Sequence, residues 1–143
     1  MTQGRPDPEV IRRHLAALRE ALGHLTAYSG RTAAELQASA ELRWTVERGL
    51  QLCVQNALDI ATHVAAASGL DSPDYATAID GLAEVAVLPV EFAARLRPIA
   101  GFRNVLVHGY LKVDLAIVER VLRESLSDLE AFAAHVDRYL DTI

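Results

Sequence analysis

Apolar side chains recur along this chain every three or four residues, the spacing that gathers them on one face of an α-helix. The first series follows Asp7-Pro8, a helix N-cap with proline at the first helical position. It predicts a helix that runs to about Tyr28 and ends at Ser29-Gly30. The apolar positions of this helix are Ile11, Leu15, Leu18, Leu22 and Leu25.

Signals for helix starts and ends continue through the middle of the chain. Thr32 to Glu35 form a capping box, which predicts a short helix that continues into the next one or bends before it. The next helix ends at Ser68-Gly69, and Ser72-Pro73 predicts the N-cap and first position of a helix that ends near Leu88-Pro89. The apolar stripe of the longer helix is Val46, Leu50, Cys53, Ala57, Ile60 and Val64.

The last third of the chain predicts two more helices. Pro89 is expected to open one with a kink at Pro98 and an end at Gly109, and Asp114 is expected to cap one final long helix that reaches Leu140. Strand patterns are absent, and a 51% hydrophobic fraction with only 6% aromatics is typical of aliphatic helix packing. We therefore expect an all-α antiparallel bundle of five to six helices, with residues 1–143 as a single domain.

A row of polar residues follows the longest predicted helix at every fourth position, from Glu47 through Gln51, Gln55 and Asp59 to His63. Such a row is either solvated surface or a polar interface. Asp59 and His63 have a spacing that could hold a metal ion, but no third ligand is evident, so we expect no metal site and no cofactor.

Charge is unevenly distributed along the chain. The net charge of −5 argues against broad nonspecific nucleic-acid binding, which needs basic surface. Residues 92–113 nevertheless contain no Asp or Glu and carry +4, which leaves −9 for the rest. The four cations are Arg95, Arg97, Arg103 and Lys112. Arg95, Arg97 and Lys112 are candidates for RNA binding if RNA is the substrate.

Features of secreted and membrane proteins are missing from the sequence. The residues after Met1 are polar, and no uncharged apolar run approaches the roughly 20 residues that span a bilayer. The single cysteine, Cys53, cannot form an internal disulfide and lies at a helical apolar position. These observations predict a cytoplasmic protein without a membrane segment.

The stretch GFRNVLVHGY, residues 101–110, carries the chemistry. Arg103 falls within an apolar helical stripe, so its guanidinium needs a carboxylate, a partner chain or a bound anion. His108 follows five positions later, about 140° round an ideal helix. The two meet only if the helix unwinds before Gly109, or if Arg103 faces His108 of a second chain across a two-fold interface.

An Arg beside a His suits phosphodiester chemistry, because one group stabilises charge on phosphorus while the other moves a proton. With RNA, the 2′-hydroxyl supplies the nucleophile and no metal is needed. The spacing alone also fits a structural explanation, in which Arg103 forms an ion pair and His108 is a cation at a helix C-terminus.

The string RNVLVHGY resembles the R-x4-H-x-Y signature of the HepT-like branch of the HEPN superfamily. VERGLQLCVQNALDIATHV resembles that family's second conserved helix, and VDLAIVERVLRESLSDLEAF its closing helix. The resemblance covers roughly residues 42–132, while the N-terminal helix matches only in character. This chain has Gly109 where many members carry an acidic residue.

The resemblance implies a homodimeric, metal-independent ribonuclease toxin with both Arg-His pairs in a cleft at the two-fold axis. Arg103 would stabilise the transition state, His108 would be the general acid or base, and Asn104 would orient the phosphate or the histidine. Tyr110 corresponds to the tyrosine that a partner MNT-type nucleotidyltransferase, the antitoxin, modifies with AMP. Asp59 would meet Arg103 as part of the cleft lining, a plain exposed face being the alternative.

Two functional hypotheses follow. In the first, the chain is an endoribonuclease toxin that acts through Arg103 and His108 and is silenced at Tyr110. In the second, it is a non-catalytic helical subunit that binds a nucleotide or a partner within a nucleotidyltransferase complex. The acidic overall charge and the limited basic surface motivate the second hypothesis.

Overall fold

The computed structural model describes residues 4–109 and 112–143, and every regular element within them is helical. Eight α-helices and one 3-10 turn make up this described part: α1 (Pro8–Leu25), η1 (Thr26–Tyr28), α2 (Ala33–Ala38), α3 (Ala40–Ala67), α4 (Tyr75–Glu84), α5 (Val90–Leu96), α6 (Ile99–His108), α7 (Leu115–Glu124) and α8 (Leu126–Leu140). The all-α prediction is confirmed. The predicted count of five to six helices is too low, because two of the predicted helices are each broken in two.

Local capping explains where the first helices begin. The Asp7 side chain accepts a hydrogen bond from the backbone N–H of Glu9 at the start of α1. Thr32 and Glu35 form the predicted capping box at the start of α2. The chain then bends before α3, because Ser39 is extended (φ −132°) and its hydroxyl caps the new helix at the N–H of Leu42.

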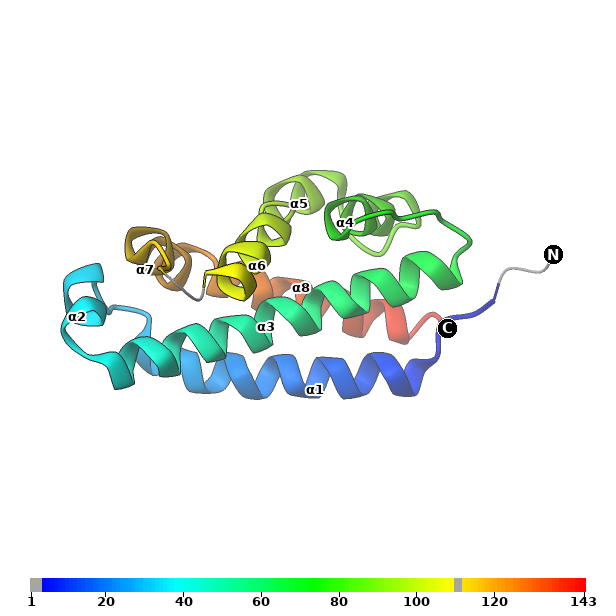
Figure 1. Ribbon diagram of the computed structural model, residues 1–143. Coiled ribbons are helices and arrows are strands. Elements are labelled where there is room, and N and C mark those ends of the chain that lie inside the picture. The colour runs from blue at the N-terminus through cyan, green and yellow to red at the C-terminus, as the bar shows by residue number, and fades with distance from the viewer. Residues whose placement is uncertain (1–3, 110–111) are drawn as a thin grey trace.

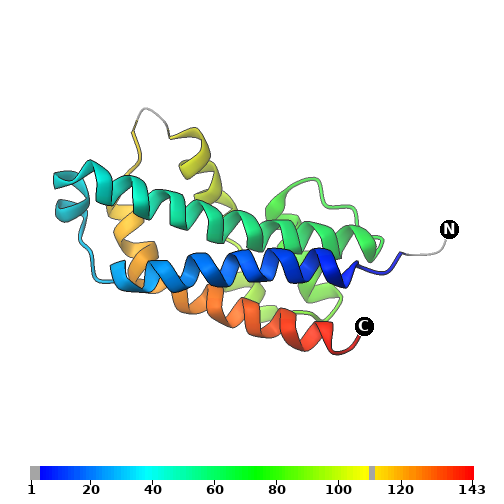
Figure 2. The same cartoon turned by 90° about the horizontal axis from the view of Figure 1, so that it is seen from below.

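The long helices form one layer and the short ones cover it. α1 packs on both α3 and α8, which also contact each other, and runs antiparallel to both (Figure 2). α4, α5 and α6 lie over α3 on the opposite side from α1 (Figure 1). Gly49 allows the close approach of α1 and α3, since a Cβ there would lie 2.7 Å from Leu25 Cδ2. The buried apolar side chains of these layers form a single cluster within the described residues.

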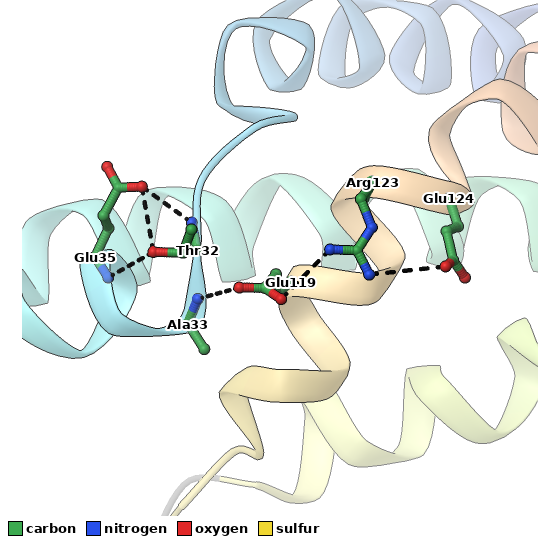
Figure 3. A network of polar contacts seen from close by, with 6 residues as sticks. All are labelled: Thr32, Ala33, Glu35, Glu119, Arg123 and Glu124. Carbon is green, nitrogen blue, oxygen red and sulfur yellow. Dashed lines mark hydrogen bonds and ion pairs between the residues drawn. The ribbon is translucent and has the colours of Figure 1, made fainter.

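A polar network connects α2 to α7 at one end of the molecule (Figure 3). The Glu119 carboxylate accepts a 2.7 Å hydrogen bond from the backbone N–H of Ala33, the first residue of α2. Arg123, one turn later on α7, pairs with the other Glu119 oxygen and with Glu124. α7 is therefore fixed to α2, while α8 packs on α1 and α3.

Three predicted helix boundaries are wrong. Asp74, not Ser72, caps α4, because its carboxylate accepts from the Thr77 N–H at 2.8 Å. The helix expected to open at Pro89 does so, with Pro89 as the N-cap of α5. The kink expected at Pro98 is instead a full break between α5 and α6, because proline has no N–H to continue the helical hydrogen bonds. The final helix breaks at Ser125, since one straight helix cannot contact α2 with one half and α1 and α3 with the other.

No helix among the described residues is long and apolar enough to cross a bilayer.

Candidate active site

α6 positions the motif. Its first turn is anchored by three buried side chains, Ile99, Ala100 and Phe102, and the helix packs on α3 and α4. Arg103 comes next in sequence and is half-buried, with less burial than its place in the apolar stripe predicts. The helix remains regular through His108 and ends at Gly109, the predicted terminator.

Three groups hold the Arg103 guanidinium. Its Nε donates a 3.0 Å hydrogen bond to Oε1 of Gln55 on α3, and Nη1 donates to Oδ1 of Asn104 at 3.2 Å. The guanidinium carbon lies 5.2 Å from the centre of the Tyr75 ring, a cation–π distance. All three partners are neutral side chains. Of the three partners expected for Arg103, a carboxylate is absent from these contacts, and a partner chain or a bound anion stays a prediction.

Asp59 reaches Arg103 only through Gln55. The Gln55 Nε2 donates to Asp59 Oδ1 at 2.8 Å and also lies 3.3 Å from the Tyr75 hydroxyl oxygen, which accepts. The predicted direct meeting of Asp59 with Arg103 is therefore replaced by a relay, because the Gln55 side chain occupies the position beside Nε. Tyr75 was missed in the sequence, since it lies on another helix, 28 residues from Arg103.

The polar row of α3 winds away from the site as it continues. His63, at its end, accepts a 2.9 Å hydrogen bond from the backbone N–H of Asp7 rather than joining Asp59. Among residues 4–109 and 112–143, no group of three or more His, Cys, Asp or Glu side chains is placed to hold a metal ion.

His108 is exposed on the last turn of α6. Because the helix does not unwind before Gly109, an ideal rise and rotation separate His108 from Arg103 by about 7.5 Å along the axis and about 140° around it. The His108 imidazole therefore does not fold back onto Arg103 of the same chain in this structure. The route through a second chain stays open.

The basic segment of the sequence is partly neutralised in space. Arg95 pairs with Asp128 of α8 at 3.2 Å, and its guanidinium carbon lies 5.1 Å from the centre of the Phe92 ring. Arg97 pairs with Asp80 of α4 at 3.1 Å. Lys112 is exposed, with no ion pair among the described residues. RNA binding by these three residues stays a prediction.

A cleft of about 560 Å³ lies beside the motif, between α6 and the start of α4. Asn104 and Gly101 form one wall, and Asp74 and Tyr75 form the other. Hydrogen bonds from Thr77, the backbone N–H first, lower the pKa of Asp74, so this carboxylate keeps its negative charge at the rim. Tyr110 lies outside the described residues.

Comparison with known proteins decides the family. The family model described as ribonuclease HepT-like matches residues 18–136, most of the chain. The chain belongs to the ribonuclease HepT-like family. The tRNA nuclease HepT of Aphanizomenon flos-aquae is 28% identical over 96% of this chain and 94% of its own. The mRNA nuclease HepT of Shewanella oneidensis is 30% identical over 64% of this chain and 69% of its own.

Solved structures show the same fold. A tri-AMPylated HEPN toxin of Shewanella oneidensis, in complex with an MNT antitoxin, superposes with a TM-score of 0.78 and 23% identity, covering 90% of this chain and 97% of that one. The resemblance to the HepT-like branch drawn from the motif is thus confirmed by family, relatives and fold. The two HepT relatives differ in the RNA they are named for, so family membership leaves the RNA target of this HepT-like chain open.

Proposed function

We propose that this chain is the toxin of a toxin–antitoxin pair, a cytoplasmic, metal-independent endoribonuclease whose catalytic groups are Arg103 and His108. The observation that carries the proposal is the Arg103 side chain, which is held by neutral groups and keeps its Nη side on the exposed part of the site. A guanidinium so placed binds a phosphate through parallel N–H donors. Membership of a ribonuclease family supports phosphodiester cleavage as the reaction.

The reaction runs through the RNA itself. The 2′-oxygen attacks phosphorus as its proton leaves to a base, and the bond from phosphorus to the 5′-oxygen breaks as that oxygen gains a proton. Arg103 stabilises the negative charge on the non-bridging oxygens, and His108 is the proton-transfer group. The products are a 2′,3′-cyclic phosphate and a 5′-hydroxyl, and no redox change or metal is involved.

The active unit in this proposal is a homodimer. Arg103 and His108 diverge on a helix that stays regular, and His108 is exposed, so a second copy is what brings the two groups to one phosphate. Light scattering at micromolar concentration should give about twice the chain mass of 15.6 kDa. A monomer that cleaves RNA would contradict the shared site.

Expression of matched variants tests the catalytic assignment. Wild type, Arg103→Ala and His108→Ala are induced in a host that lacks the antitoxin, and growth and RNA integrity are followed together. Only wild type should arrest growth and cut RNA, and purified wild type should cut tRNA or mRNA with EDTA present. Equal behaviour of all three at equal soluble levels would refute the nuclease and favour the non-catalytic subunit.

Silencing by a partner completes the proposal. Tyr110 follows His108 by two positions, and an AMP group there would add bulk and negative charge beside the site. The likeness to a tri-AMPylated toxin bound to an MNT antitoxin supports a nucleotidyltransferase partner. Incubation with that enzyme and ATP should add AMP to wild type and stop RNA cleavage. Tyr110→Phe should remain active after the same treatment; inhibition of this variant would place the control elsewhere.

A further inference from the structure

We infer that Gln55 is a positioning residue that orients the Arg103 guanidinium without neutralising it, and that Asp59 and Tyr75 set the orientation of Gln55. This inference rests on the proposed catalytic role of Arg103. It assigns a positioning role to Gln55 and Asp59 of α3 and to Tyr75 of α4.

The direction of the Gln55 amide follows from its neighbours. A carboxylate only accepts hydrogen bonds, and the Asp59 oxygen is 2.8 Å from one end of the amide, so that end is assigned as the NH₂ group. The other end, the carbonyl oxygen, then faces Arg103 Nε, which only donates, at 3.0 Å. Asp59 thus dictates that an acceptor is presented to Arg103, although the two residues do not touch.

Tyr75 contributes twice to the same arrangement. Its hydroxyl oxygen accepts from the second N–H of the Gln55 amide at 3.3 Å. Its ring lies under the guanidinium, 5.2 Å from the ring centre to the guanidinium carbon. The guanidinium is consequently fixed at its Nε edge and on one face, while Nη1 reaches the exposed Asn104 side chain.

The Gln55 side-chain amide is uncharged, so it leaves the positive charge of Arg103 available to a phosphate. A carboxylate placed directly on Arg103 would hold the guanidinium equally well, but it would offset the positive charge that a phosphate needs. With Gln55 between them, the negative charge of Asp59 lies one side chain further from the reacting phosphate. The relay therefore gives fixed geometry and full charge together.

Two substitutions at Gln55 separate these effects. Gln55→Glu keeps the length and an acceptor oxygen at Nε but adds the charge and loses the N–H donors to Asp59 and Tyr75. Gln55→Met keeps the bulk but removes both the acceptor and these donors. Gln51→Glu is the matched control, because Gln51 lies one turn earlier on α3 and accepts from Arg48 at 3.2 Å, so it receives the same charge beside another arginine.

Activity and side-chain order are then measured on the dimeric protein. With a defined RNA, kcat for both Gln55 variants should fall on the order of tenfold to a hundredfold, while Gln51→Glu stays near wild type. The Arg103 Nε–H signal in ¹⁵N NMR, assigned with Arg103→Lys, should stay protected from exchange in wild type and Gln55→Glu and lose protection in Gln55→Met. Fully active Gln55→Glu would refute the need for a neutral relay.

The NMR arm keeps this inference separate from the proposed function. If wild type cuts no RNA, the nuclease proposal fails, while loss of Nε–H protection in Gln55→Met would still show that Gln55 holds Arg103. If the Arg103 signal is identical in wild type and Gln55→Met, the positioning role is wrong, whatever the activity of wild type.

Discussion

At the scale of single residues, the site depends on contacts between chain segments that are far apart. Arg103, His108 and Asn104 could be named from the sequence because they lie within one short motif. The other two groups that hold Arg103 could not, because Gln55 is one of several polar positions on α3 and Tyr75 lies on α4. Periodicity shows which face a residue occupies, and only packing shows what lies opposite.

Gly109 is a residue whose size is dictated by its surroundings. A Cβ there would lie against the carbonyl oxygen of Val105 and 2.7 Å from Val113 Cγ2. We expect Gly109→Ala to lower the free energy of unfolding by about 1–3 kcal/mol, as overpacked substitutions do, in urea denaturation followed by circular dichroism. This turn accepts only glycine in its present form, so any larger residue at this position would require another geometry.

Gly101 supplies the control on the same helix. A Cβ at Gly101 would meet nothing within 4 Å, so Gly101→Ala should raise the free energy of unfolding by up to about 1 kcal/mol through helix propensity. Equal effects of the two substitutions would show that the end of α6 adapts freely, against the expectation.

At the scale of elements, most helix starts were predictable, with α4 as the exception, and the full helix breaks were not. Asp7, Thr32 and Asp114 cap their helices as the sequence indicates, because a cap depends on residues two or three positions away. The break at Ser125 depends on what α7 and α8 contact elsewhere. Pro98 was visible as a kink, but the full separation of α5 from α6 was not.

The cap of α2 gives the fold a pH-dependent contribution. Hydrogen bonds from Arg31 and from the Thr32 N–H lower the pKa of Glu35 below its ordinary value of 4.5. The folded state therefore binds this proton more weakly than the unfolded chain does, so the contribution is complete above pH 4.5 and is lost as the pH falls through the lowered pKa. Glu35→Gln should melt below wild type at pH 7, and this difference should shrink on acidification.

Thermal melts followed by circular dichroism between pH 7 and strongly acidic pH measure this difference. Glu20→Gln, on the exposed face of α1, removes a carboxylate of the same kind without removing a cap, and it corrects for the general change of charge. A difference in melting temperature between wild type and Glu35→Gln that grows on acidification would contradict this expectation.

At the scale of the whole molecule, Cys53 reports on the opening of the core. Its side chain is fully buried in α3, and burial raises the pKa of the thiol from 9.0 to about 12. At pH 8 the folded protein should resist labelling by DTNB, since the thiolate is the reactive form and the core excludes the reagent. Labelling should appear with increasing urea at the same midpoint as the loss of helix signal.

Coincident midpoints would show that the helices around α3 open cooperatively. Cys53→Ala must give no labelling, since Cys53 is the only cysteine of the chain. Rapid labelling in the absence of urea would mean that α3 is exposed by a local motion without global unfolding.

The pairing of Arg95 with Asp128 and of Arg97 with Asp80 determines how this protein meets a polyanion at long range. The positive charges of Arg95 and Arg97 are largely cancelled at long range by their carboxylate partners. The molecule as a whole carries a net charge of −5. The RNA substrate proposed above is therefore not drawn in by a broad attractive potential, and its binding should displace few counterions. The association rate should therefore be low. Discrimination between RNA molecules then depends on the dissociation rate of each complex.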